Sequence, residues 1–208
     1  MANKISTLKG YAKWAKVFEP DTKFDADGVY SVKLVLSQEE AAQLDESLGA
    51  IAQERFNEEV KRSPKLKNSL SIQMPIDSEF DMDGNETGNK EVKFKLKAKV
   101  RTREGSTYDQ KPVVVDAKRN PMSGDSLIGN GSLVKVAYET IPYFVAATKV
   151  VGVTLRLKGL QVLELNEYAN KGAGMFDDED GYVEEARVAA ERDPFAEDET
   201  EGAAAGDF

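Results

Sequence analysis

Six basic side chains alternate with six uncharged ones between Val92 and Arg103, where the sequence reads VKFKLKAKVRTR. Successive side chains of a β-strand point to opposite faces, so this pattern predicts one strand with an apolar face and a cationic face. Like charges about 7 Å apart repel one another, and a polyanion lying along them relieves that repulsion. The pattern therefore favours contact with nucleic-acid phosphates through Lys93, Lys95, Lys97, Lys99, Arg101 and Arg103.

Two other interpretations of this strand stay open. Lysines also protect a solvated edge strand against aggregation, although one or two charges usually suffice for that purpose. A docking face for acidic segments of a partner protein would need the same cations, and RNA could replace DNA as the polyanion. Aromatic rings beside the cations would favour nucleic acid, because bases stack on rings and an acidic peptide does not need them.

Charge is distributed unevenly along the chain, whose net charge is −9. Residues 176–208 contain 13 Asp or Glu and 2 Lys or Arg, which leaves 26 basic and 24 acidic residues in 1–175. A nearly neutral body thus precedes an acidic tail, and long blocks of like charge are typical of disordered interaction tails. A tethered polyanion next to a cationic groove would compete with nucleic acid for that groove.

Composition argues against most catalytic chemistry. The chain has no Cys and no His, which removes thiolate nucleophiles, disulfides and the commonest general base and metal ligand. No phosphate-loop motif or metal-ligand spacing occurs, so we expect neither an enzyme nor a cofactor. The sequence contains neither a signal-peptide pattern nor an apolar run of membrane-spanning length, so we expect an intracellular protein without a membrane partner.

Hydrophobic periodicity predicts a mainly β fold with one helix. Ser37 to Glu40 fits a helix capping box, and apolar residues at helical spacing follow as far as Ser63-Pro64, which predicts a helix over 38–62. Strands are expected over 5–18, 28–36, 92–103, 112–116, 132–141 and 149–165, with a polar loop over 77–90. This order suits an OB-fold-like, five-stranded Greek-key barrel with an inserted amphipathic helix. We assign residues 1–172 to this domain and 173–208 to a disordered acidic tail.

Several aromatic residues are candidates for stacking on bases. Tyr108 is expected at a polar hairpin tip near Lys111, and Tyr143 follows Pro142 at a strand end. Tyr11 shares a strand face with Lys13. Trp14 is also a candidate, although a core position is favoured for it, and Phe94 is expected in the core.

The chain resembles the family of single-stranded DNA-binding proteins of bacteriophage T7 and related phages. The likeness covers nearly the whole length and ends at the terminal Asp207-Phe208. It is carried by eight short segments in one order, namely Gly28–Val32, Val92–Lys95, Val113–Lys118, Ile128–Ser132, Val134–Tyr138, Ile141–Tyr143, Val153–Leu157 and Val162–Leu165.

This resemblance implies an OB fold with one inserted helix that binds single-stranded DNA without sequence preference, in the cytoplasm of the infected bacterial host. Carried over by position, Lys4 and Lys95 would contact phosphates and Tyr143 would stack on a base. It also implies homodimers, and a tail that docks on the phage DNA polymerase and primase-helicase through Asp207 and Phe208. The implied processes are phage DNA replication, recombination and repair.

Overall fold

The computed structural model describes residues 5–81, 83–102, 104–124 and 127–166. Four predicted site residues, Lys4, Arg103, Asp207 and Phe208, lie outside the described residues. The expected acidic tail over 173–208 lies outside them as well.

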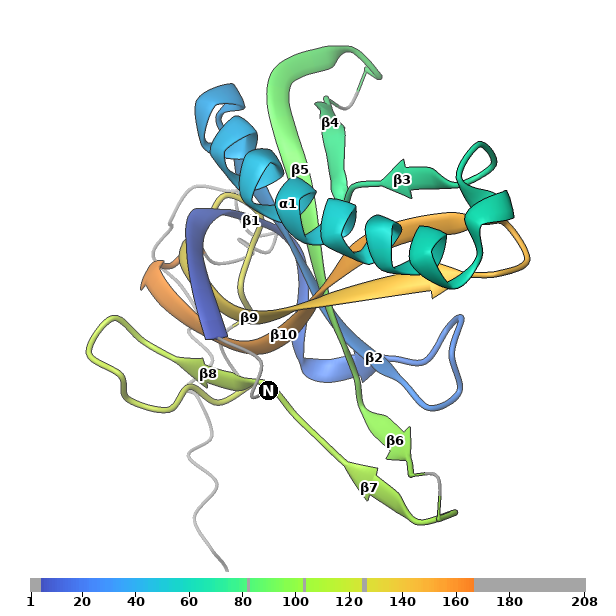
Figure 1. Cartoon of the computed structure of the whole chain (residues 1–208). Coiled ribbons are helices and arrows are strands. Elements are labelled where there is room, and N and C mark those ends of the chain that lie inside the picture. Colours follow the sequence, from blue (N-terminus) through green and yellow to red (C-terminus); the bar gives the residue numbers. More distant parts are fainter. Residues whose placement is uncertain (1–4, 82, 103, 125–126, 167–208) are drawn as a thin grey trace, which may run out of the picture. The chain divides into compact units, whose positions relative to one another are not determined.

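Five strands close into a barrel, as the sequence predicts (Figure 1). Around the barrel they follow the order β1, β2, β5, β10, β9 and back to β1, and every pair is antiparallel except β5 with β10. Their bounds are β1 Ile5–Asp21, β2 Val29–Leu36, β5 Glu86–Lys97, β9 Leu133–Val145 and β10 Val150–Glu164. The OB-fold-like barrel expected from the sequence is therefore confirmed.

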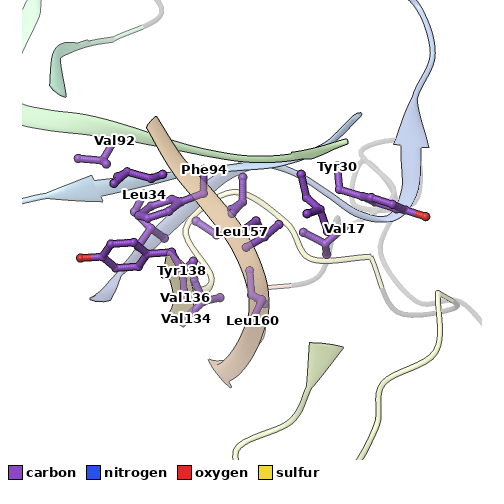
Figure 2. Close-up of a cluster of buried hydrophobic side chains, with 14 of the residues drawn as sticks. Val17, Tyr30, Leu34, Val92, Phe94, Val134, Val136, Tyr138, Leu157 and Leu160 are labelled. Carbon is purple, nitrogen blue, oxygen red and sulfur yellow. The ribbon is translucent and has the colours of Figure 1, made fainter. Parts of the chain in front are cut away.

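Alternate residues of each barrel strand fill the interior. Figure 2 shows side chains of this core, in which the rings of Phe94 and Tyr138 have centroids 5.2 Å apart. Val92, Phe94 and Leu96 are buried, which confirms the predicted apolar face of the lysine strand and the core position of Phe94. The lysines between them consequently point outward.

One α-helix is present among the described residues, α1 (Gln38–Arg62), which joins β2 to the later barrel strands and packs against β9 and β10 (Figure 1). The predicted bounds and the capping box are both confirmed. The Ser37 hydroxyl accepts a hydrogen bond from the Glu40 amide at 3.3 Å, and a Glu40 carboxylate oxygen accepts one from the Ser37 amide at 3.0 Å. A short 3₁₀ helix, η1 (Pro64–Leu66), follows. Within the described chain, no helix has the length and apolarity needed to cross a bilayer.

Short strands extend the sheet around the barrel. β3 (Ser71–Gln73) and β8 (Val113–Val115) pair parallel to β10, and β4 (Ile76–Phe80) pairs antiparallel to β5. The polar loop predicted over 77–90 is therefore wrong, because most of it belongs to the β4–β5 hairpin. The side chains of this hairpin are largely exposed, so the sequence of β4 shows no hydrophobic periodicity. Pairing with β5 stabilises β4 instead.

The single strand predicted over 92–103 is also wrong, because the chain leaves the barrel at Ala98. β5 ends at Lys97, and β6 (Lys99–Arg101) forms a separate two-stranded sheet with β7 (Thr107–Asp109). At the break, the Ala98 amide donates to the Gly28 carbonyl and the Ala98 carbonyl accepts from the Gln110 amide, both at 2.8 Å. These two bonds turn the chain from the barrel into a hairpin (Figure 1).

Candidate nucleic-acid interface

Strand register gathers cations from four strands on one outer face of the barrel. Lys13 of β1 pairs with Lys33 of β2, which in turn pairs with Lys93 of β5. Neighbouring strands are about 4.8 Å apart, so these three residues form a row across the sheet. Lys95 lies two residues further along β5, and its partner on β10 is Arg156. We call these five residues the cationic face.

The lysines of β5 do not guard an exposed edge. β5 pairs with β2 on one side, and on its other side with β4 and then with β10. An aggregation guard is needed only where backbone N–H and C=O groups are unpaired. The edge-strand interpretation of these lysines is therefore wrong, and the repulsion among them needs another compensation.

Two carboxylates neutralise the other two lysines of the row, Lys13 and Lys33. A Glu91 oxygen lies 2.6 Å from the Lys13 ammonium, and the other Glu91 oxygen contacts the Lys33 ammonium. Glu79 of β4 adds a second contact to Lys13 at 3.3 Å. The Glu91 side chain is only 8% exposed, so these ion pairs are partly shielded from water. In the described residues, no acidic groups cluster as metal ligands would.

The ion pairs between Glu91 and the two lysines shift the pKa values of Glu91 and Lys13. Burial alone would raise the pKa of the Glu91 carboxyl, but hydrogen bonds and positive charge from Lys13 and Lys33 outweigh it and hold the pKa below its usual 4.5. The hydrogen bond to Glu91 raises the pKa of Lys13 above 10.5. Lys13, which was predicted to contact nucleic acid, thus lies on the cationic face but already has a counterion.

Lys93 is in the opposite electrostatic situation. Burial lowers the pKa of its ammonium below 10.5, and the charges of Lys95 and Lys33 lower it further, against a smaller opposing effect of Asp21. Among the described residues, neither Lys93 nor Lys95 forms an ion pair. A bound phosphate would favour the charged form of both lysines, so this end of the face is suited to an anion.

Exposed rings accompany the cations on β1. Tyr11 lies two residues before Lys13 on the same outer face, as strand alternation predicts, and is 55% exposed. Trp14 is 57% exposed, so the core position favoured for it is wrong. A β-bulge between Lys13 and Lys16 interrupts the alternation, and Trp14 adopts φ 55° there while its amide donates to the Asn130 side chain at 2.9 Å. The bulge turns the ring outward, where it is accessible to a base.

Four further predicted residues lie on or beside the β6–β7 hairpin instead of the cationic face. Lys99 and Arg101 share one face of the hairpin, whereas Tyr108 pairs with Val100 and points to the other. Lys111 follows β7 and lines a hollow with Lys99 at the base of the hairpin. Lys97, the last residue of β5, pairs with Asp25 at 3.4 Å. The predicted line of six cations is therefore divided between the barrel and the hairpin.

Tyr143 packs against the sheet. It pairs with Gly152 of β10, and a Cβ atom at Gly152 would lie 2.5 Å from the Tyr143 hydroxyl oxygen. The ring thus occupies the space that the glycine leaves, and the residue is half-buried. A stacking role for Tyr143 stays a prediction.

Three residues on or near this face were not predicted from the sequence. Lys33 is the one cation of β2, and Arg156 is one of two cations in β10. The same alternation that singled out β5 would place both on the outer surface. Phe24, in the β1–β2 loop, lies in a run of Asp and polar residues without periodicity, so only the structure places it beside Lys93 and Lys95.

Comparison with known proteins links this geometry to one family. The family model described as single-stranded DNA-binding protein, bacteriophage T7, matches residues 6–165. The single-stranded DNA-binding protein of Enterobacteria phage T3 is 28% identical over 188 residues, which are 84% of this chain and 80% of that protein. The crystal structure of gp2.5, a single-stranded DNA-binding protein encoded by bacteriophage T7, superimposes with a TM-score of 0.65 and 26% identity, covering 88% of this chain and 100% of that one.

Proposed function

We propose that this chain, which belongs to the T7 family of bacteriophage single-stranded DNA-binding proteins, binds single-stranded DNA along the cationic face, without sequence preference. The family consists of binding proteins, which agrees with the expectation that the chain is not an enzyme. The observation that carries the proposal is that the lysines of β5 point outward although this strand is paired with neighbours on both sides.

Both components of a single-strand binding surface, cations and exposed rings, are available on β5 and β1. Lys93 and Lys95 would neutralise successive phosphates, while Tyr11 and Trp14 offer exposed rings to the bases. Base–aromatic stacking is insensitive to sequence because every base has a π-face, and each stacked base contributes about 1–3 kcal/mol. The exposed rings favour this function over docking of acidic protein segments, which needs cations alone.

A salt titration tests the proposal. Binding to an oligo-dT of about 16 nucleotides should weaken as salt rises, with a slope of about −0.7 in log affinity per phosphate neutralised. Substituting Lys93 by Ala should reduce the slope by about one such step, whereas Lys65→Ala, beyond the end of α1, should leave it unchanged. A slope near zero for the wild-type chain would refute the proposal. Parallel titrations with oligo-U and an acidic peptide of equal length would reveal an RNA-binding or protein-docking function instead.

The acidic tail extends the proposal to regulation and partners. With a net charge of −11 over 176–208, the tail would compete with DNA for the cationic face. The same segment would recruit the phage DNA polymerase and primase-helicase, with Asp207 and Phe208 as the contact. These interactions would serve replication, recombination and repair in the cytoplasm of the infected host, with the protein acting as a homodimer.

Removing residues 197–208 separates these tail functions from DNA binding. The truncated protein should bind oligo-dT more tightly and lose association with the polymerase and the primase-helicase. A Phe208→Ala variant keeps the charge of the side chains, so it should lose the partners while retaining normal DNA affinity. Weaker DNA binding after truncation would contradict the competition between tail and DNA.

A further inference from the structure

The β1–β2 loop forms one wall of a hollow on the barrel surface. Phe24, near the middle of this loop, is 89% exposed, the highest value among the exposed large hydrophobic side chains of the described chain. The hollow measures about 230 Å³ and opens between the loop and the outer face of β5. Its lining consists of Asp21, Phe24, Asp25, Val29, Ser31, Lys93 and Lys95.

The loop that carries this ring is held in place by several hydrogen bonds. The Asp21 carboxylate accepts from the Lys23 amide at 2.9 Å, and the Asp25 carboxylate accepts from the Asp27 amide at 3.1 Å. Asp25 also pairs with Lys97 of β5, which ties the loop to the strand that bears the lysines. At the end of the loop, Gly28 adopts φ +74°, a conformation that L side chains rarely adopt. The loop thus holds Phe24 at the hollow.

Charges divide the hollow into two sides. The β5 side carries the ammonium groups of Lys93 and Lys95, and the loop side carries the carboxylates of Asp21 and Asp25. A phosphate is attracted by the first pair and repelled by the second. The Lys23 ammonium lies over the Phe24 ring, 5.4 Å from its centroid, but the side chain is still 89% exposed, so an uncharged planar group can approach its remaining apolar surface.

We infer that this hollow is a nucleotide subsite in which the base stacks on Phe24 and the phosphate lies against Lys93 and Lys95. The inference rests on the proposed function and adds to it a stacking residue outside the β1 rings. The volume of the hollow agrees with a site for a single nucleotide. It is smaller than the roughly 300–1,000 Å³ of pockets that enclose whole drug-sized ligands. The ring recognises a π-face and no base edge, so the subsite would preserve sequence independence.

The test compares Phe24→Ala with Phe24→Trp on an oligo-dT and on an abasic deoxyribose-phosphate oligomer of the same length. Phe24→Ala should weaken oligo-dT binding about 5- to 150-fold, the range that corresponds to loss of one stacked base. Its affinity for the abasic oligomer and its salt slope should match the wild type, because the variant retains every cation. Phe24→Trp should restore oligo-dT affinity, and its added indole fluorescence should be quenched by DNA.

Phe80→Ala is the matched control, since this ring on β4 is 51% exposed but does not line the hollow, so it should bind both oligomers normally. Phe24 is so exposed that both of its variants should retain the wild-type melting temperature. Normal oligo-dT binding by Phe24→Ala, or an equal loss on both oligomers, would overturn the subsite while leaving the proposed function intact. Failure of the wild-type protein to bind oligo-dT would overturn both.

Discussion

Replacement of Glu91 by Gln should strengthen DNA binding and make it more sensitive to salt. In the folded protein this carboxylate neutralises Lys13 and Lys33, which lie beside Lys93 in the row of the cationic face. A phosphate that approaches either lysine has to displace an anion already in contact with it. Glutamine has nearly the same shape and no charge, so the substitution releases the lysines with little change in packing.

The structure sets the size of the effect. Lys33 pairs with Glu91 alone among the described residues, whereas Lys13 keeps its contact with Glu79. The salt slope should therefore steepen by about 0.7 if only Lys33 is released and by about 1.4 if both lysines are released. Between about 50 and 200 mM salt, the advantage of the variant over wild type should shrink roughly 2.5- to 7-fold.

Fluorescence anisotropy of a labelled oligo-dT over a salt series measures this slope. Glu58→Gln serves as control, because Glu58 pairs with Arg55 on α1 and should not affect binding. Adding Lys33→Ala to Glu91→Gln should remove most of the gain, which isolates the coupling between the two residues. If Glu91→Gln leaves the slope unchanged or weakens binding, the carboxylate orients the lysines for DNA and does not compete with it.

Three further predictions concern stability and pH. Gly152→Ala should displace the Tyr143 ring and destabilise the fold by about 1–3 kcal/mol, because the new Cβ would also lie 2.8 Å from a carbonyl oxygen of β3. Gly49→Ala, within α1 and with nothing within 4 Å of the new Cβ, should instead stabilise it by about 0.5–1 kcal/mol, and thermal melting distinguishes the two. Acid should destabilise the protein through Glu91, because the pKa of this carboxyl is lower in the folded state than in the unfolded state. The contribution of Glu91 to the free energy of unfolding is complete above the usual pKa of 4.5 and is lost as pH falls through the folded-state pKa. Glu91→Gln should accordingly flatten the dependence of the unfolding free energy on pH in this acid range; an unchanged dependence would exclude Glu91 as its source.

Much of the fold is predictable because its determinants are local. The capping box at Ser37 and the helical spacing after it specify α1 within a short stretch of sequence. Alternation in β5 assigns Phe94 to the core and Lys93 to the surface without reference to any other strand. Periodicity fails at Trp14, where one extra residue in a bulge reverses the phase of the strand.

By itself, the sequence determined the five barrel strands, the helix and the presence of a basic strand, since hydrophobic period and capping act over a few residues. Only the tertiary structure decided which cations share a face. Strand register brings Lys33 and Arg156 to β5, and the backbone bonds at Ala98 carry Lys99 away with the hairpin. Pairing also brings Glu91 against two lysines, which decides how much positive charge is left for a ligand. Such contacts join residues far apart in the chain, so their geometry depends on closure of the whole barrel.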